Sequence, residues 1–294
     1  MNRRPNMNTA RAGKCVPMLY GIRPWRLMLA AAMILALTGC GTRQARVDVH
    51  ESLNATLWTQ TSAEYVGSTT QAYRAATVNL DQALADLKWT AALEQDGDYG
   101  GLPPAVMLDL DQTVLDTSSY NARIILEHGS YSQETFNAWC RNFTAPAVPG
   151  ARKFLDHAVE KGVRVIYYSA RREALRDCTT SNLEALGMPL PEQQWLLLNE
   201  GTPSTSKEQQ RTTMAGKFRI LLLVGDNLDD FIGGSKNHAA SRRALAAQHA
   251  DRWGREWIIL PNPMYGHWES SLYGFDYSLP REIQLQHKLQ PLQE

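Results

Sequence analysis

Two aspartates that are one residue apart, Asp109 and Asp111, directly follow the apolar run 106–108. A short apolar run that begins after a pair of prolines is typical of a buried strand in a parallel sheet. Because side chains alternate along a strand, the two carboxylates should point the same way at its carboxyl end. Each charge raises the cost of ionising the other, so the pair indicates a bound cation or a proton-transfer reaction. An ordinary acidic turn after a strand is the alternative for this pair taken alone.

Further polar groups are predicted at the same edge of the sheet. Ser169 is the last residue of a second predicted strand, Lys207 precedes the fourth, and Asp226 and Asp230 follow the fourth. The carboxyl ends of parallel strands share one edge, where the ligands of open α/β sheets bind. Carboxylates with a hydroxyl and an ammonium, and without a histidine or cysteine cluster, favour Mg²⁺ bound together with a phosphate oxygen.

Each of these assignments has a structural alternative. Ser169 could cap the following helix. Lys217 is a rival to Lys207, although it lies too near the fourth strand. Asp229 is expected to be a solvated neighbour rather than a ligand, and Asp230 could serve only to cap the loop.

The elements that must position these groups alternate between strand and helix, which predicts an α/β fold with a doubly wound parallel sheet. A helical segment over 51–95 precedes the sheet, and a small helical cap that carries aromatic residues is inserted at about 115–150. We expect strands over 106–108, 163–169, 195–198, 220–225 and 257–260, and helices over 151–161, 172–186, 206–218 and 241–249.

The length of 294 residues fits one large domain with an insertion, here 51–294. The net charge is +0, from 30 basic and 30 acidic residues, so no overall field attracts a nucleic-acid polymer. A hydrophobic content of 44% with 20% charged residues is ordinary for a globular protein and argues against disorder in the body of the chain.

The N-terminus carries a different pattern. Arg23 and Arg26 precede the apolar segment 27–37, which is too short for an ordinary spanning helix and leads into Cys40. This arrangement resembles a bacterial lipoprotein signal peptide, 1–39, after whose removal Cys40 carries lipid. A cytosolic protein with an apolar N-terminal helix and a chance cysteine is the alternative.

The lipoprotein interpretation sets the expected location of the protein. Residues 40–50 would be a polar tether, and Gly41, which is not the aspartate of inner-membrane retention, favours the outer membrane with the domain facing the periplasm. The segment before the signal is long, so Met18 is an alternative translation start. In that oxidising compartment Cys140 and Cys178 could form a disulfide, but the sequence does not give their distance.

Four segments of the chain resemble the four motifs of the haloacid dehalogenase (HAD) superfamily of phosphatases, namely 109–113, Ser169, Lys207 and 225–230. More narrowly, the chain resembles the class C acid phosphatases, the lipoprotein 5'-nucleotidase family. The added matches are the lipoprotein signal, Trp58 through Tyr65, Tyr73, Val224 through Phe231, and Leu260 through Gly266, which together cover nearly all of the mature chain.

The resemblance implies a covalent phosphatase mechanism. Asp109 would attack phosphorus and form an aspartyl-phosphate, which splits one difficult step into two. Asp111 would protonate the leaving alkoxide and later accept a proton from the hydrolytic water. Asp109, the backbone carbonyl of Asp111 and Asp226 would bind Mg²⁺.

The resemblance also assigns the groups that hold the phosphate. Ser169 and the Lys207 ammonium would hold the transferring oxygens, where negative charge must be stabilised. Asp230 would orient a metal-bound water or Lys207. Arg171 would be a further phosphate contact.

Three positions depart from the family pattern. Relatives usually carry glutamate where this chain has Gln112 and asparagine where it has Ala170, and they often carry tryptophan where it has Phe136. None of these positions performs the covalent chemistry. The missing amide at Ala170 would weaken phosphate positioning, and Phe136 would affect substrate preference.

Aromatic residues near the predicted site could form a slot for a flat base. The candidates are Tyr265, Phe136, Trp139 and Tyr120, although core or hinge packing is an equal alternative for the last two. Stacking of a base on an aromatic ring contributes roughly 1–3 kcal/mol and tolerates many bases. Nucleoside monophosphates are therefore the favoured substrates, with small aryl phosphates as additional ones.

Two other functions stay open from the sequence. An aspartyl-phosphate can be captured by an alcohol instead of water, which would make the enzyme a phosphotransferase. A binding lipoprotein, for haem or adhesion, could carry such a site incidentally, but a complete set of acids, lysine and metal ligands is costly to keep without use. The expected partners are a small phosphomonoester and, through the anchor on Cys40, the membrane.

Overall fold

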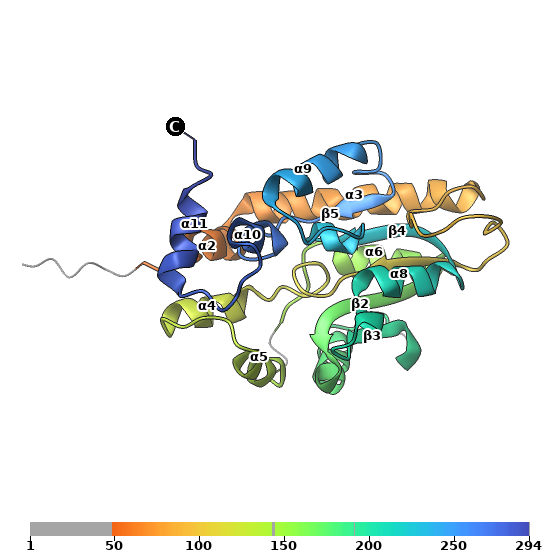
Figure 1. The fold of residues 1–294 in the computed structure, drawn as a ribbon. Helices are drawn as coiled ribbons and strands as arrows, with labels where there is room; N and C mark the ends of the chain where they lie inside the picture. Colours follow the sequence, from red (N-terminus) through yellow and green to blue (C-terminus); the bar gives the residue numbers. More distant parts are fainter. Residues whose placement is uncertain (1–48, 143–144, 191, 294) are drawn as a thin grey trace, which may run out of the picture. The chain divides into compact units, whose positions relative to one another are not determined.

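A parallel sheet forms the centre of the fold in the computed structural model, which describes residues 49–142, 145–190 and 192–293 (Figure 1). Its strands lie in the order β3-β2-β1-β4-β5 and all pairings are parallel. They are β1 (Pro104–Leu108), β2 (Arg164–Arg172), β3 (Leu196–Asn199), β4 (Arg219–Gly225) and β5 (Trp257–Ile259). The predicted doubly wound parallel sheet is confirmed. The chain moves outward from β1 to β3 and then returns to β4, so the topological switch point lies between β1 and β4.

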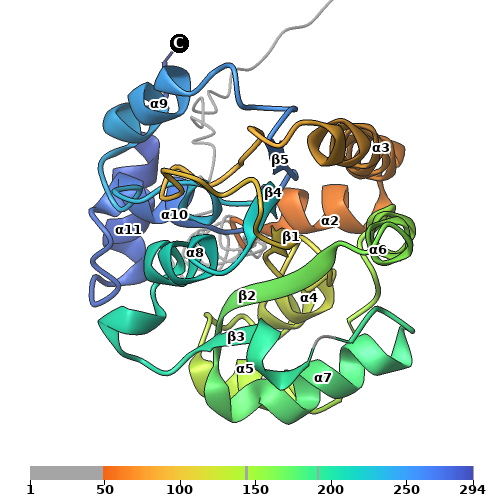
Figure 2. The ribbon, with the colours of Figure 1, turned by 90° about the vertical axis from the view of Figure 1, so that its right-hand side faces the viewer.

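Helices cover both faces of this sheet, as Figure 2 shows. On one face α3 (Ala63–Ala85) packs against β4 and β5, and α6 (Ala151–Glu160) packs against β2. On the other face α8 (Lys207–Ala215) packs against β2 and β4. The side chains of β1 alternate between the two cores, with Val106 and Leu108 on the α3 side and Met107 on the α8 side.

The helical segment predicted over 51–95 is broken and ends early. It consists of α2 (Leu53–Thr61) and α3, because Ser62 adopts an extended backbone and its side chain caps α3 by accepting a hydrogen bond from Tyr65 N. After Ala85 the chain leaves the helix. The Trp89 indole then donates to the carbonyl of Leu221 at 2.8 Å, so the following segment packs against the sheet instead of extending the helix.

The predicted helical cap is present as α4 (Ser118–Leu126) and α5 (Gln133–Cys140). The second strand extends beyond its predicted end, because Arg172 of β2 still pairs with Asn199 of β3. The helix predicted to start at 172 therefore begins later, as α7 (Arg176–Ala185), after a single turn of 3-10 helix.

The C-terminal part contains α9 (Ala239–Gln248), α10 (His267–Ser270) and α11 (Arg281–Leu289). The last two have no counterpart in the sequence-based prediction, since α10 is one turn long and α11 contains no buried residue. The predicted signal peptide, Cys40 and most of the tether lie outside the described residues. Among the described helices, none has the length and apolar character needed to cross a membrane.

Candidate active site

The carboxylates that follow β1 and β4 meet at the topological switch point. Asp109 follows β1, Asp226 and Asp230 follow β4, and one oxygen of each lies within 4.8 Å of the others. Lys207 is the first residue of α8, and its Nζ donates to Asp109 Oδ1 at 2.7 Å and also to Asp230. The structure therefore brings together four groups from three separate segments of the chain.

This cluster carries more negative charge than one lysine neutralises. Burial, with the nearby carboxylates, raises the pKa of Asp109 to about 7 against the opposing effect of Lys207. Burial, Asp230 and Asp109 also raise the pKa of Asp226 well above its usual range. Burial disfavours the charge of Lys207, but Asp109 and Asp230 outweigh it and raise the lysine pKa. A divalent cation stabilises the charged form of converging carboxylates, so Asp109, Asp226 and Asp230 could hold a metal ion.

Neighbouring groups fix the orientation of the two carboxylates after β4. Asn262 Nδ2 donates to Asp226 Oδ2 at 2.8 Å, and Thr113 Oγ1 donates to Asp226 Oδ1 at 3.4 Å. The backbone N of Asn227 donates to Asp230 Oδ2 at 2.8 Å. No role is predicted for Asn262 from the sequence, although it follows β5 at the same edge of the sheet. The rule that locates Asp226 would therefore also have located Asn262.

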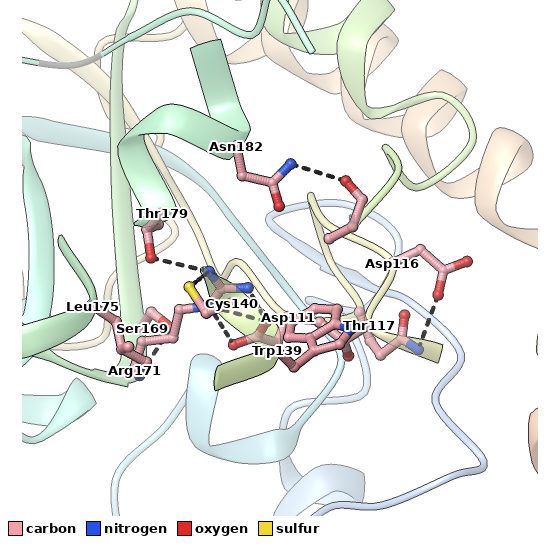
Figure 3. Close-up of polar contacts among 12 residues, drawn as sticks. Asp111, Asp116, Thr117, Trp139, Cys140, Ser169, Arg171, Leu175, Thr179 and Asn182 are labelled. Carbon is pink, nitrogen blue, oxygen red and sulfur yellow. Dashed lines mark hydrogen bonds and ion pairs between the residues drawn. The ribbon is translucent and has the colours of Figure 1, made fainter. Parts of the chain in front are cut away.

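Asp111 forms a separate ion pair with Arg171 (Figure 3). Arg171 Nε donates to both carboxylate oxygens, at 3.1 and 3.0 Å, and Nη2 donates to Oδ1 at 2.7 Å. The arginine lies on the extension of β2, so the guanidinium reaches Asp111 from the neighbouring strand. Arg171 thus has a carboxylate partner in the structure, while its contact with phosphate stays a prediction.

Ser169 is buried within β2, two residues before Arg171 of this ion pair. Its Oγ accepts a hydrogen bond from the backbone N of Arg171 at 3.2 Å, which leaves the hydroxyl proton free to be donated. It does not cap the following helix, because Leu175 occupies the N-cap position of α7. The rival lysine, Lys217, lies over the ring of Trp195, so Lys207 is the lysine of the cluster.

Three of the four aromatic candidates pack together in the cap. The ring centroid of Phe136 lies 5.1 Å from that of Tyr120 and 5.3 Å from that of Trp139. The Trp139 indole donates to Ser119 Oγ at 3.2 Å, and the Tyr120 hydroxyl shares a hydrogen bond with Thr135 at 2.8 Å. Trp139 and Tyr120 therefore hold the cap together, as the packing alternative expects, and their contact with substrate stays a prediction.

Phe136 and Tyr265 lie closer to the charged groups. The guanidinium carbon of Arg171 lies 5.6 Å from the centroid of the Phe136 ring. The Tyr265 hydroxyl shares a hydrogen bond of 3.0 Å with Thr117 Oγ1, which connects the loop after β5 to the start of the cap. Burial and the nearby Asp111 carboxylate raise the pKa of Tyr265. Phe136 is nevertheless buried in the cap, so contact of either ring with a substrate stays a prediction.

Cys140 and Cys178 form a disulfide that joins α5 of the cap to α7. Their Cα atoms are 5.9 Å apart although 38 positions separate them in the sequence. No local pattern encodes that distance, which is why the sequence leaves the pairing open.

Comparison with known proteins agrees with this architecture. The family model described as HAD superfamily, subfamily IIIB (Acid phosphatase) matches residues 26–268. The chain is similar to a class C acid phosphatase from Bacillus anthracis, with 32% identity and a TM-score of 0.75 over 83% of this chain and 97% of that one. A tungstate-bound structure of the class C acid phosphatase from the same organism gives 30% identity and a TM-score of 0.74, with the same coverage.

Two curated plant proteins match a smaller part of the chain. Acid phosphatase 1 from Solanum lycopersicum is 26% identical over 167 residues, 54% of this chain and 57% of the relative. Stem 28 kDa glycoprotein from Glycine max is 26% identical over 170 residues, 54% of this chain and 58% of the relative. The chain thus spans a little over half the length of these relatives. Since the family model covers most of the chain, including all four motif segments, the chain belongs to the HAD superfamily, subfamily IIIB, of acid phosphatases.

Proposed function

We propose that this protein is a Mg²⁺-dependent phosphomonoesterase that hydrolyses nucleoside monophosphates and other small phosphate esters. The observation that supports it most is the convergence of Asp109, Asp226 and Asp230 within 4.8 Å, with Lys207 donating to two of them. A phosphoryl group in transfer carries its negative charge on three oxygens. An ammonium and a divalent cation placed beside an aspartate are suited to stabilise that charge while the aspartate attacks.

The metal is assigned to the acidic cluster. Asp109, the backbone carbonyl of Asp111 and Asp226 would hold Mg²⁺, which when bound neutralises charge on the phosphoryl oxygens. Asp230, the third carboxylate of the cluster, would orient Lys207, which donates to it, or a metal-bound water. Asn262 and Thr113 keep the Asp226 carboxylate in place for this role. Hard carboxylate oxygens favour Mg²⁺ over the softer transition metals.

The covalent chemistry is assigned to the two aspartates after β1. A carboxylate oxygen of Asp109 forms a bond to phosphorus while the bond from phosphorus to the ester oxygen breaks, which gives an aspartyl-phosphate. Asp111 donates a proton to the departing ester oxygen. It then accepts a proton from the water that attacks the aspartyl-phosphate, so that inorganic phosphate leaves and Asp109 is regenerated. Lys207 and Ser169 hold the phosphoryl oxygens through both steps.

A nucleotide is the proposed substrate because aromatic rings stand beside the site. Phe136 lies on the cap and Tyr265 lies on the loop after β5. A flat base could stack on either ring. A nitrophenyl phosphate would use the same phosphate site with fewer contacts.

The test is phosphate release from a panel of nucleoside monophosphates and a nitrophenyl phosphate, with Mg²⁺ or with a chelator. We expect release that requires Mg²⁺ and is lost in Asp109→Asn, and a labelled aspartyl-phosphate when the wild-type reaction is stopped with acid. Full activity of Asp109→Asn, or activity that is indifferent to the chelator, would contradict the proposal. Phosphate captured by an added alcohol would identify the phosphotransferase instead.

We also propose that Cys40 carries lipid and anchors the protein in the outer membrane. The support is the pattern of Arg23, Arg26, the apolar segment 27–37 and the cysteine that follows. Labelled palmitate should enter the full-length chain in a bacterial host and be absent from Cys40→Ser. Equal labelling of both proteins would rule the anchor out.

A further inference from the structure

Arg171 lies between the proton-transfer residue Asp111 and two side chains from distant helices (Figure 3). On one side its Nε and Nη2 donate to the Asp111 carboxylate. On the other side its Nη1 donates to Thr179 Oγ1 of α7 at 2.9 Å and lies 3.7 Å from Cys140 Sγ of α5. We infer that Arg171 is a positioning residue that fixes the Asp111 carboxylate, and that Thr179 holds Arg171 in this role.

The burial of the three residues supports this direction of action. Arg171 is 3% exposed and Thr179 is 0% exposed, whereas the Asp111 side chain is 19% exposed. Protein therefore encloses the arginine, whereas the Asp111 carboxylate remains accessible to substrate and water. A buried guanidinium is costly unless it is paired, and the Asp111 carboxylate is its charged partner.

The geometry of the pair suits a proton-transfer group. A planar guanidinium that contacts both oxygens of a carboxylate fixes the plane of that carboxylate as well as its distance. A general acid must stand within hydrogen-bond reach of the departing oxygen and in a defined direction. Asp111 is on a sharply turning loop, where the next residue, Gln112, has a φ of 58°. The contact with the Arg171 guanidinium therefore fixes a side chain that no regular element holds in place.

The disulfide holds α5 and α7 together beside Arg171. Cys178 is the neighbour of Thr179 on α7, and its bond to Cys140 holds α5 against the same side of Arg171. Phe136, on α5, stacks near the guanidinium at 5.6 Å. The cap, which the substrate is proposed to contact, is thereby linked to the residue that orients Asp111.

This inference rests on the proposed function, because it depends on the proton-transfer role of Asp111. The experiment compares two leaving groups: the alkoxide of a nucleoside monophosphate, which needs a proton, and nitrophenolate, which leaves as a stable anion. The kcat/KM for each substrate reports the steps up to aspartyl-phosphate formation, where Asp111 acts as the acid. The variants are Thr179→Val, Thr179→Ser and Arg171→Lys, with Asp111→Asn as reference and Arg172→Lys, on the exposed neighbour, as matched control.

We expect Thr179→Val and Arg171→Lys to lower kcat/KM for the nucleotide by about tenfold or more, in line with the loss of a buried charge-assisted hydrogen bond. The value for nitrophenyl phosphate should fall by less than about threefold, the same pattern as in Asp111→Asn. Thr179→Ser, which keeps the hydroxyl, should restore most of what Thr179→Val loses. Binding of tungstate, followed by its effect on thermal unfolding, should be unchanged in Thr179→Val.

Two results would overturn the inference while leaving the proposed function intact. An equal loss on both substrates with weaker tungstate binding would make Arg171 a phosphate contact. Equal losses in Thr179→Val and Thr179→Ser would show that the hydroxyl has no part in the effect. If Arg171→Lys does not fold, the comparison of Thr179→Val with Thr179→Ser still tests the inference. Absence of Mg²⁺-dependent release from the wild-type protein would instead reject the proposed function itself.

Discussion

Asp109 and Asp111 are two positions apart, yet the groups that hold them come from two different parts of the molecule. The partners of Asp109 are Lys207, at the start of α8, and the carboxylates that directly follow β4. The partner of Asp111 is Arg171, which depends on α7 and on the cap helix α5. The half of the site that we propose to bind metal and attack phosphorus, called the metal-binding half, is therefore built mainly on strand ends. The half that we propose to transfer protons, called the proton-transfer half, is built on long-range side-chain contacts, and we expect the two halves to respond differently to mutation.

The largest effect is expected in the metal-binding half. Asp226→Asn removes one charge from the cluster, so kcat at fixed Mg²⁺ should fall by about a thousandfold, which is several kcal/mol of lost charge stabilisation. The losses for nucleotide and nitrophenyl phosphate should be similar, because both substrates present the same phosphoryl group. Steady-state kinetics over a Mg²⁺ titration measures both expectations.

Asp229→Asn is the matched control for that change. Asp229 lies on the same turn, but its Oδ1 accepts a hydrogen bond from Ser235 at 2.7 Å, a bond that asparagine can keep. Its activity should remain within a few-fold of wild type. A loss as large as that of Asp226→Asn would show that the whole turn, rather than the metal ligand, is responsible.

The disulfide should affect the stability of the protein but not the metal-binding half of the site. Replacing both Cys140 and Cys178 by serine should lower the free energy of unfolding by about 3–4 kcal/mol, since the bond closes a loop with a sequence separation of 38. Urea unfolding with and without a reductant measures it, and the double variant should no longer respond to the reductant. Mg²⁺ affinity should be unchanged, because no metal-binding residue lies on α5 or α7 among the described contacts. A marked drop in that affinity would break the distinction between the halves.

The metal-binding half could be predicted from the sequence. Asp109 and Asp226 directly follow apolar runs, and the rule that parallel strands end at one edge is enough to bring them together. Lys207 lies in a polar stretch at the start of α8, and its place in the site is expected from the resemblance to the family motifs. The same rule also locates Asn262, which follows β5 at this edge. The parallel pairing of the strands follows from the alternation of strands and helices, whereas their order, with β1 at the centre, comes from the structure.

The proton-transfer half could not be predicted in the same way. Thr179 is an ordinary residue of a helix, and nothing in its neighbourhood indicates that its hydroxyl accepts from an arginine eight positions earlier. The extension of β2 that carries Arg171 depends on pairing with Asn199, a contact between distant segments. Local patterns encode which residues end a strand, but they do not encode which side chains meet across a cap.

The aromatic rings test whether the cap contributes to substrate binding. Phe136→Ala and Tyr265→Ala should each raise KM for a nucleotide by about tenfold, the loss of one stacking contact. KM for a nitrophenyl phosphate should change less. Trp139→Phe, a change inside the packed cap, is the control and should affect both substrates little. Equal effects of Phe136→Ala and Tyr265→Ala on both substrates would remove the stacking proposal.

The smallest effect is a pH dependence of metal stabilisation. In the metal-free protein burial raises the pKa of Asp109 from 3.8 to about 7, and burial with the neighbouring carboxylates raises the pKa of Asp226 well above its usual range. Between pH 3.8 and about 7, the unfolded and folded pKa values of Asp109, the folded state keeps a proton that the unfolded state has lost. The free energy of unfolding therefore falls as the pH rises through this range. Mg²⁺ bound to these carboxylates would replace the protons and offset this loss.

The rise in Tm on adding Mg²⁺ should therefore be larger at about pH 7.5 than at about pH 5, by about 2–4 °C for each kcal/mol of additional binding free energy. Thermal unfolding with Mg²⁺ or with a chelator at each pH measures it. The paired comparison removes other titrating groups, such as His267, whose pKa is lowered by burial. Asp226→Asn should lose most of the difference between the two pH values, whereas Thr179→Val, which belongs to the other half of the site, should keep it. If Thr179→Val also lost the difference between the two pH values, the two halves of the site would be energetically coupled although different segments build them.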